Sequence, residues 1–220
     1  MKDLYRPRTS TLGAESQLTA LLCEIYVCAA MAGLCDEFTL IRPRQGGRTP
    51  EFEAALAGQR LCGEVKRYPW KEEGEVVDTS EVRLGVHSRA KSLAQKLDDD
   101  LRPKFSAGLI NLGFVHRPSL GDIVSHPATF SAILGFAPRA LPSGIRHSAS
   151  VQDLRNALCL VYNMPDWSVV SGIFLVRLNM GRFGECLPPE ACWFPNPRAA
   201  TTLSSELASR IRDALSQRPC

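Results

Sequence analysis

The fold is decided by the stretch PEFEAALAGQRLCGEVK at residues 50–66. Residues 51–56 and 60–66 each alternate between polar and apolar side chains, which is typical of half-buried β-strands. The connection Ala57-Gly58-Gln59 is short and contains a glycine. We therefore expect a β-hairpin over this stretch.

Side-chain direction gathers charged groups on one face of this hairpin. Successive side chains on a strand point to opposite faces, so Glu51 and Glu53 share one face of the first strand. On the second strand, Glu64 and Lys66 likewise share a face. The spacing predicts that acidic groups and an ammonium converge there. The alternative is a solvated strand face, where charged residues are common.

Carboxylates beside a lysine suit the hydrolysis of phosphodiesters. Magnesium prefers oxygen ligands and keeps several waters, so one carboxylate from each strand can hold it against a phosphate. A bound ion acidifies its water, and a nearby lysine can reach that water or the phosphate oxygens. The backbone carbonyl of Val65 is expected to face the same point and to be a further ligand.

The spacing of Pro50, Glu51, Glu64 and Lys66 resembles the active-site motif of the PD-(D/E)XK superfamily of restriction-endonuclease-like proteins. The first acid of that motif is usually Asp, whereas this chain has Glu51. Its longer side chain leaves two choices for the first metal ligand, Glu51 or Glu53. The resemblance implies Mg²⁺ or Mn²⁺ as the cofactor.

The resemblance also implies the fold class, an α/β mixed β-sheet flanked by helices. The family order is a helix, three antiparallel strands, a second helix and a parallel strand. The sequence provides matching segments in that order: a helix at residues 16–33, a strand at 38–43, the hairpin, a helix at 82–101 and a buried strand at 107–115. We expect a single domain over residues 1–220, with its core at about 15–115 and an α/β extension at 116–220.

Other site residues follow from the same resemblance. The leading helix of the family often adds a carboxylate to the metal site, which Glu15 or Glu24 would do here. Basic and polar residues around the hairpin and on the following helix are candidates for phosphate contact: Arg48, Arg67, Lys91 and Gln95. A solvated surface is the alternative explanation of these side chains.

The second half of the chain has no chemical motif of its own. We expect helices at residues 120–134, 151–162 and 203–215, a core strand at 169–178 and a turn-rich loop at 193–197.

Net charge and cysteine spacing bear on the partners and the cellular location of the protein. The net charge is only +3, so charge alone does not indicate a nucleic-acid partner. The 8 cysteines lack zinc-site spacing, which favours buried thiols in a reducing compartment. Since no signal segment or membrane-spanning run is evident, we expect a cytoplasmic protein without a membrane partner.

Taken together, these features predict a metal-dependent endonuclease acting on nucleic acid, with DNA as the expected substrate and a homodimer left open. Glu51 and Glu64 would hold the ion, and Lys66 would act on water or phosphate. The alternative is a protein of this fold that binds nucleic acid or serves in assembly without turnover. Glu51 in place of Asp keeps that alternative open.

Overall fold

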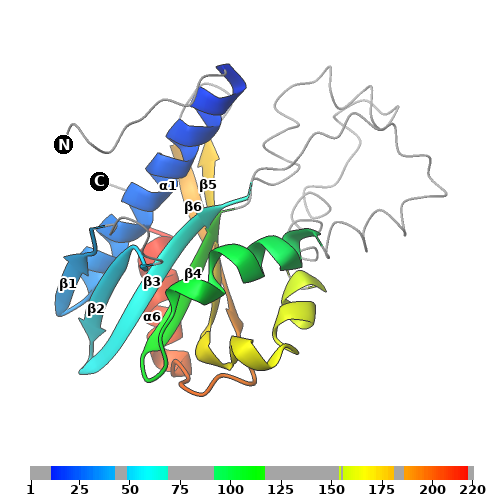
Figure 1. The fold of residues 1–220 in the computed structure, drawn as a ribbon. Coiled ribbons are helices and arrows are strands. Elements are labelled where there is room, and N and C mark those ends of the chain that lie inside the picture. Colours follow the sequence, from blue (N-terminus) through cyan, green and yellow to red (C-terminus); the bar gives the residue numbers. More distant parts are fainter. Residues whose placement is uncertain are drawn as a thin grey trace, which may run out of the picture.

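A computed structural model describes residues 11–42, 49–68, 92–116, 154, 156–180 and 186–217 (Figure 1). The helix expected at residues 120–134 and the first half of the one expected at 82–101 lie outside these ranges. Side chains of residues 11–19 are also outside the description.

A 6-stranded mixed sheet with strand order β1-β2-β3-β4-β5-β6 forms the centre of the structure. The strands are β1 (Glu37–Leu40), β2 (Phe52–Leu56), β3 (Gln59–Arg67), β4 (Ile110–His116), β5 (Gly172–Met180) and β6 (Cys186–Pro195). Strands β1, β2 and β3 are antiparallel to one another, while β3, β4 and β5 run parallel. Strand β6 closes the order antiparallel to β5. The expected α/β class with a mixed sheet is therefore confirmed.

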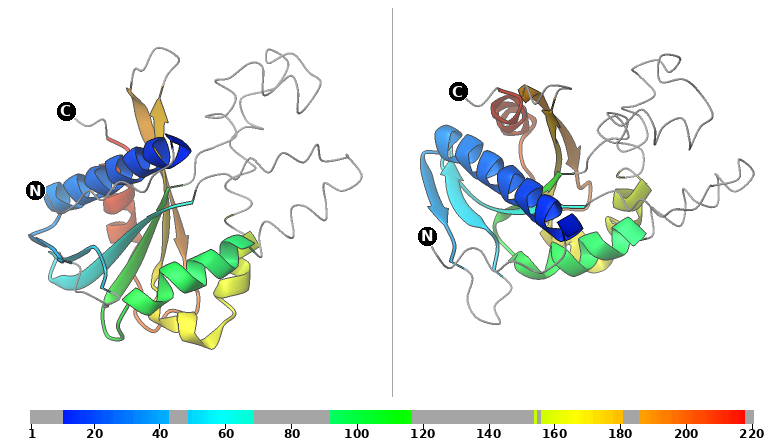
Figure 2. Two further views of the ribbon diagram at one scale, coloured as in Figure 1. Left: turned by 45° about the horizontal axis from the view of Figure 1, so that its top comes forward. Right: turned by 90° about the horizontal axis from the view of Figure 1, so that it is seen from above.

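Helices cover both faces of this sheet (Figure 2). On one face lie α1 (Thr11–Leu34) and α6 (Ser205–Leu215), which share a core with β2, β3 and β4. On the other face lie the helix at residues 92–100 and the helical segment at 156–161. Strand β4 runs between the two layers with every residue buried, as expected for a parallel strand covered on both faces.

The predicted hairpin is confirmed as the pair β2–β3. Its turn residues Ala57 and Gly58 have φ values of 50° and 75°. Two successive positive φ angles are typical of the tight turn that matches strand twist. Asp36 supports this turn, because its Oδ2 accepts a hydrogen bond of 2.8 Å from the Ala57 N–H.

Glycine is required where the hairpin crosses the α1 layer. A Cβ at Gly63 would lie 2.1 Å from Cζ of Phe52, which is fully buried on that face. The Phe52 ring therefore packs directly over the Gly63 backbone. This contact fixes the register that sets Glu64 beside β2.

Buried asparagines organise the opposite end of β4 and β5. The Asn111 amide donates to the carbonyls of Ser106 and Val169 at 2.7 Å each and accepts from the Cys62 thiol at 2.7 Å. Asn196 likewise donates to two backbone carbonyls, and its Oδ1 accepts from a backbone N–H. We call these two residues the asparagine network. Each side-chain polar atom in it has a partner, so its burial costs little.

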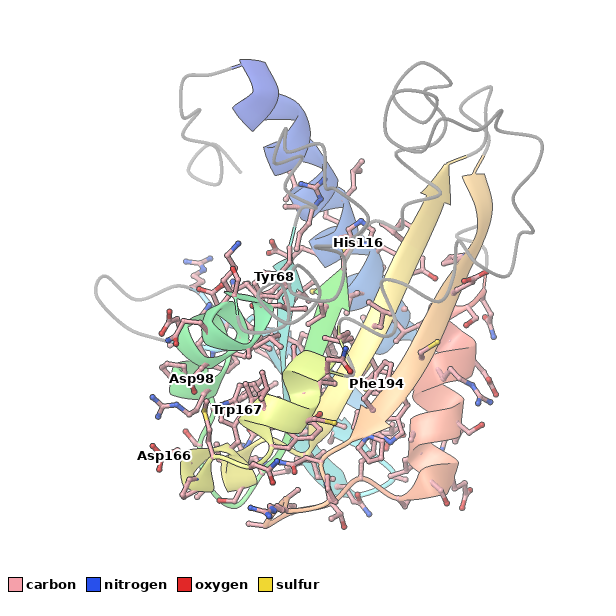
Figure 3. The ribbon with its side chains drawn as sticks, turned by 90° about the vertical axis from the view of Figure 1, so that its right-hand side faces the viewer. Tyr68, Asp98, His116, Asp166, Trp167 and Phe194 are labelled. Carbon is pink, nitrogen blue, oxygen red and sulfur yellow. The ribbon has the colours of Figure 1, made fainter. Side chains whose placement is uncertain are left out.

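The segment that follows the helix at 92–100 is tied to the second helical layer (Figure 3). It forms the short helix η1 (Arg102–Lys104). Oδ1 of Asp98 accepts from Trp167 Nε1 at 2.7 Å and from Arg102 Nε at 3.0 Å. Because Trp167 is fully buried, this pairing fixes the backbone of η1 against the core.

The loop expected at residues 193–197 is wrong for its first three residues. Trp193, Phe194 and Pro195 belong to β6 and pair with the start of β5. Proline suggests a turn in a sequence, but it is tolerated on an edge strand, where its missing N–H breaks no ladder. Strand β6 is such an edge strand.

Two other strands differ from expectation in their bounds: β1 ends at Leu40, before the expected end at residue 43, and β4 begins at Ile110 instead of residue 107. The remaining described elements agree with expectation. Helix α1 covers the predicted 16–33, β5 covers most of 169–178, and α6 lies within 203–215. Ser204 caps α6 by accepting from the Leu207 N–H. The six cysteines whose side chains are described are free thiols, but only Cys23 and Cys62 are buried; Cys28 and Cys35 are half-buried, and Cys159 and Cys192 are exposed. Within the described ranges, no helix is long and apolar enough to cross a membrane.

Candidate active site

The hairpin register places Glu51 next to Glu64. Phe52 pairs with Gly63, and the Glu51 N–H donates to the Gly63 carbonyl at 2.9 Å. Glu51 and Glu64 are therefore cross-strand neighbours on the same face. Lys66 joins them, since its Nζ lies 2.6 Å from Oε1 of Glu64 and 3.8 Å from Oε1 of Glu51. Three residues that the sequence singled out thus come together.

Glu64 is fully buried, yet only one of its oxygens is paired. The ammonium groups of Lys66 and Lys104 both bond to Oε1. Oε2 is buried and has no hydrogen-bond partner among the described residues. A buried carboxylate oxygen without a donor is costly. A cation or a hydrogen-bond donor at Oε2 would therefore stabilise this buried carboxylate.

The electrostatics of this pair reflect its burial. Desolvation raises the pKa of Glu64, and neither the attraction of Lys66 nor the hydrogen bonds from both lysines overcome it. Burial alone would lower the pKa of Lys66, but the carboxylates of Glu64 and Glu51 outweigh burial and raise it. Lys66 is held as a cation, while Glu64 remains short of compensating charge.

Helix α1 contributes Glu24, one of the two acids expected from that helix; the side chain of Glu15 lies outside the description. Burial, the charge of Glu51 and a hydrogen bond with Glu51 raise the pKa of Glu24 to about 7. A carboxyl that shares a proton with a neighbouring carboxylate behaves in this way. We call Glu24, Glu51, Glu64, Lys66 and Lys104 the carboxylate–lysine cluster.

The Val65 carbonyl faces the Glu51 side of β3. Gly63, two residues earlier, directs its carbonyl to β2, and backbone groups on a strand alternate in direction with the same period. The described pairing between β2 and β3 ends at Gly63. By this alternation, the carbonyl of Val65 lies on the β2 side of β3, beyond the last paired residue of β2.

The structure does not bring Glu53 to the cluster. Its cross-strand partner is Cys62, and its carboxylate lies 3.6 Å from Arg60 on the exposed surface. Of the two acids left open by the sequence, Glu51 is therefore the one beside Glu64 and Lys66.

The residues expected to contact phosphate are placed as follows. Arg48 and Lys91 lie outside the described residues. Arg67 ends β3 and, by the alternation of side chains, points to the α1 face opposite Lys66. Gln95 is exposed and donates to Asp99 at 3.1 Å, one turn along its own helix.

Lys104 is the cluster member that the sequence did not indicate. It lies 40 residues from Glu64 in the chain, and the two meet because the parallel strand β4 returns the chain to β3. No motif spacing signals such a contact. The one available signal is its position in the short connection between the helix at 92–100 and β4, the strand that pairs with β3.

The cluster contains oxygen donors of the kind that a hard divalent cation takes. Within the described ranges, no three acidic, His or Cys side chains stand close enough to hold a metal ion as they are arranged. Glu51 and Glu64 are joined through the Lys66 ammonium instead. The unpartnered Oε2 of Glu64, the Glu51 carboxylate and the Val65 carbonyl are nevertheless the ligand types that magnesium or manganese takes.

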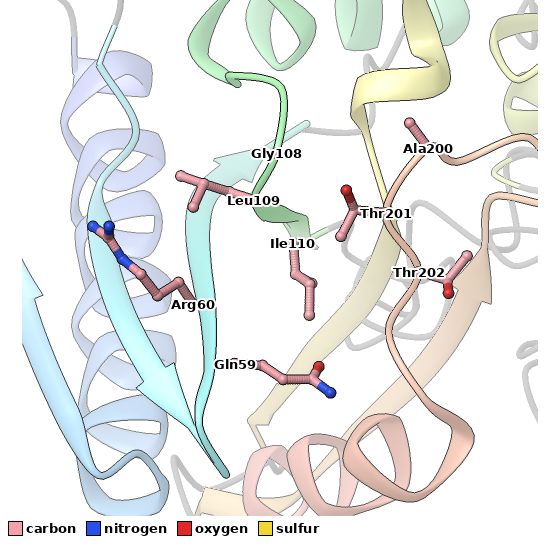
Figure 4. Close-up of a pocket in the computed structure, with 8 residues that line it drawn as sticks. All are labelled: Gln59, Arg60, Gly108, Leu109, Ile110, Ala200, Thr201 and Thr202. Atoms are coloured by element: carbon pink, nitrogen blue, oxygen red, sulfur yellow. The ribbon is translucent and has the colours of Figure 1, made fainter.

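A separate shallow pocket lies at the other end of β3 and β4 (Figure 4). It is lined by residues 59–60, 108–110 and 200–202, which include one charged side chain, Arg60. None of the carboxylate–lysine cluster lines it.

Comparison with known proteins identifies no relative: neither a family model, nor a curated protein, nor a solved structure matches this chain.

Proposed function

We propose that this protein is a metal-dependent nuclease of the PD-(D/E)XK type, which hydrolyses phosphodiester bonds of nucleic acid, with DNA as the expected substrate. The order of elements supports the restriction-endonuclease-like assignment. Helix α1, the antiparallel strands β1 to β3, the helix at 92–100 and the parallel strand β4 follow one another as the resemblance implies.

One observation carries the proposal: the half-satisfied carboxylate of Glu64. It is fully buried and bonded to two lysines through Oε1, and its Oε2 has no partner within the part of the chain that the structure describes. A structural ion pair at this depth is stable only when the remaining lone pairs are satisfied. A metal site, by contrast, requires a carboxylate oxygen that is available to coordinate the cation.

Each cluster residue has a distinct role in this proposal. Glu51 and Glu64 hold the ion, together with the Val65 carbonyl and with Glu24 at the outer edge. A divalent ion bound there would polarise the phosphate and acidify a water. Lys66 is partly exposed and reaches both carboxylates, so it can donate to a phosphate oxygen or orient the attacking water.

A second candidate is a nucleic-acid-binding or assembly protein without turnover. The two ammonium groups at Glu64 favour it, because they already neutralise part of the charge that would draw a metal. Glu51 in place of the usual Asp is consistent with the same alternative.

A cleavage assay separates these candidates. Purified protein is incubated with single-stranded, duplex and branched DNA and with RNA, each with magnesium or manganese. Cleavage by the wild type that is lost in Lys66→Ala supports the nuclease. Binding with no cleavage of any substrate supports the second candidate.

Two controls make the assay specific. Lys96→Ala removes an exposed lysine from the helix at 92–100 and should leave cleavage unchanged. Manganese should raise the melting temperature of the wild type more than that of Glu64→Ala, because a ligand that binds only the folded state stabilises it. Cleavage that persists in both Lys66→Ala and Glu64→Ala would indicate a contaminating nuclease and remove the assignment.

A further inference from the structure

The two lysines at Glu64 are not equivalent. Lys66 lies between two carboxylates, at 2.6 Å from Glu64 and 3.8 Å from Glu51. Lys104 has Glu64 as its one ion-pair partner among the described residues. One carboxylate oxygen therefore holds a second ammonium in addition to the lysine of the motif.

The backbone of Lys104 is held in place, whereas its side chain can change conformation. Its backbone belongs to η1, where the Lys104 N–H donates to the Leu101 carbonyl at 3.1 Å. Arg102 in the same turn is bound to Asp98, which also holds the buried Trp167. The Lys104 side chain is 22% exposed and has four flexible methylenes. Its ammonium can leave Glu64 without displacing the fold.

Building on the proposed function, we propose that Lys104 competes with the divalent ion for Glu64 and passes to a backbone phosphate of the nucleic acid when the ion binds. Two ammonium groups and a divalent ion at one carboxylate repel one another strongly in a buried setting. Lys66 keeps Glu51 as a partner after the ion enters, whereas Lys104 loses the one ion-pair partner that it has among the described residues.

The consequence is a coupling between metal and substrate. A phosphate beside the site offers the released ammonium a new anionic partner. Nucleic acid then favours metal binding, and metal favours nucleic acid by the same factor, as thermodynamic linkage requires. Without nucleic acid, the protein would bind the metal only weakly.

Manganese titration of the full chain by calorimetry tests the competition. Lys104→Met keeps much of the side-chain volume and removes the charge, so it should bind Mn²⁺ roughly fivefold to tenfold more tightly than the wild type. Lys104→Arg retains a cation and should keep the weaker affinity. Lys96→Met is the matched control and should match the wild type. Lys104→Gln replaces the Met variant if that variant does not fold.

The coupling is tested with a phosphorothioate-substituted DNA duplex that resists hydrolysis. This duplex should tighten Mn²⁺ binding in the wild type and do so clearly less in Lys104→Met. The salt dependence of DNA binding with metal present should also fall by about one phosphate contact in that variant.

The possible failures are distinguishable. Wild type that binds Mn²⁺ and cleaves, beside a Lys104→Met variant with equal or weaker Mn²⁺ affinity, overturns the competition and leaves the nuclease assignment standing. Absence of Mn²⁺ binding in every variant overturns both the competition and the metal site.

Discussion

Glu64 and Asn111 are buried polar residues whose side chains lie on the same face of the sheet, in neighbouring positions on β3 and β4. Asn111 pairs across the ladder with Cys62, and Glu64 follows Cys62 by two residues. Both are fully buried. Their surroundings differ in one respect: each amide atom of Asn111 has a partner, whereas Oε2 of Glu64 has none among the residues that the structure describes.

If the proposed function holds, this difference separates a structural polar group from a functional one. The asparagine network ties the loops before β4 and after β6 to the sheet, and its hydrogen bonds are complete. The carboxylate–lysine cluster concentrates charge that the fold itself does not fully compensate. A buried charge that the fold does not compensate is typical of a ligand-binding site. Substitutions in the carboxylate–lysine cluster should therefore mainly affect activity, whereas substitutions in the asparagine network should mainly affect stability.

The largest effect is expected at Glu64. Glu64→Gln should reduce cleavage on the order of a thousandfold, because the amide is a poor ligand for a hard cation. Its free energy of unfolding should change little, since the amide oxygen can still accept a hydrogen bond from a lysine and both lysine side chains are partly exposed. Initial cleavage rates and urea unfolding of the same preparation measure the two effects. A variant that unfolds readily while each folded molecule still cleaves would place Glu64 with the structural residues.

The next effect is expected in the asparagine network. Asn111→Ala should lower the free energy of unfolding by about 3 kcal/mol, because it leaves two partly buried carbonyls and a buried thiol without their partner. Cleavage per folded molecule should remain. Asn163→Ala is the matched control: Asn163 is exposed and donates one hydrogen bond to Cys159, so its removal should cost less than about 1 kcal/mol. Equal losses in the two variants would refute the distinction.

Glu24 gives a smaller, pH-dependent effect. Its pKa is about 7 in the folded protein against an ordinary 4.5, so the folded state binds the proton more tightly than the unfolded state. This contribution to stability is complete below about pH 4.5 and is lost as the pH rises through 7. The free energy of unfolding should fall by about 2 kcal/mol across that window, with the partial exposure of Glu24 taken into account.

The matched variant is Glu24→Gln, which cannot titrate at this position. It should lack this part of the pH dependence and be the more stable protein above pH 7. Urea unfolding of both proteins at pH 5, 6, 7 and 8 is the measurement. Parallel curves for the two proteins would show that Glu24 does not share a proton with Glu51.

The sequence predicted the parts of this fold that depend on local pattern. The alternation of polar and apolar residues and the Ala57-Gly58 turn identified the hairpin. The two-residue period of side-chain direction placed Glu51, Glu64 and Lys66 on one face. The apolar run before His116 identified the buried parallel strand. These features depend on a side-chain period that the backbone imposes.

Contacts between distant segments could not be read in the same way. Lys104 meets Glu64 only because β4 returns parallel to β3. Side-chain direction alone could not choose between Glu51 and Glu53, because both point to the same face. Strand β6 was missed because Pro195 suggests a turn, while its edge position, which makes a proline harmless, is a property of the whole sheet.

The smallest expected effect is at Glu53, which makes the sharpest comparison with Glu51. Both acids belong to the same strand face, two residues apart, but Glu53 is 47% exposed and faces Arg60 at 3.6 Å. Surface pairs of this kind contribute little, so Glu53→Gln should change the free energy of unfolding by less than about 0.5 kcal/mol and leave cleavage intact.

Glu51→Gln removes the neighbouring acid and should behave differently. It should weaken Mn²⁺ binding and reduce cleavage strongly, because Glu51 shares Lys66 with Glu64. Calorimetric Mn²⁺ titrations and cleavage rates of the two single variants decide the matter. Loss of metal binding in Glu53→Gln with retention in Glu51→Gln would mean that the hairpin functions in a different register from the one described, since a shift of two residues is what exchanges these acids at the site.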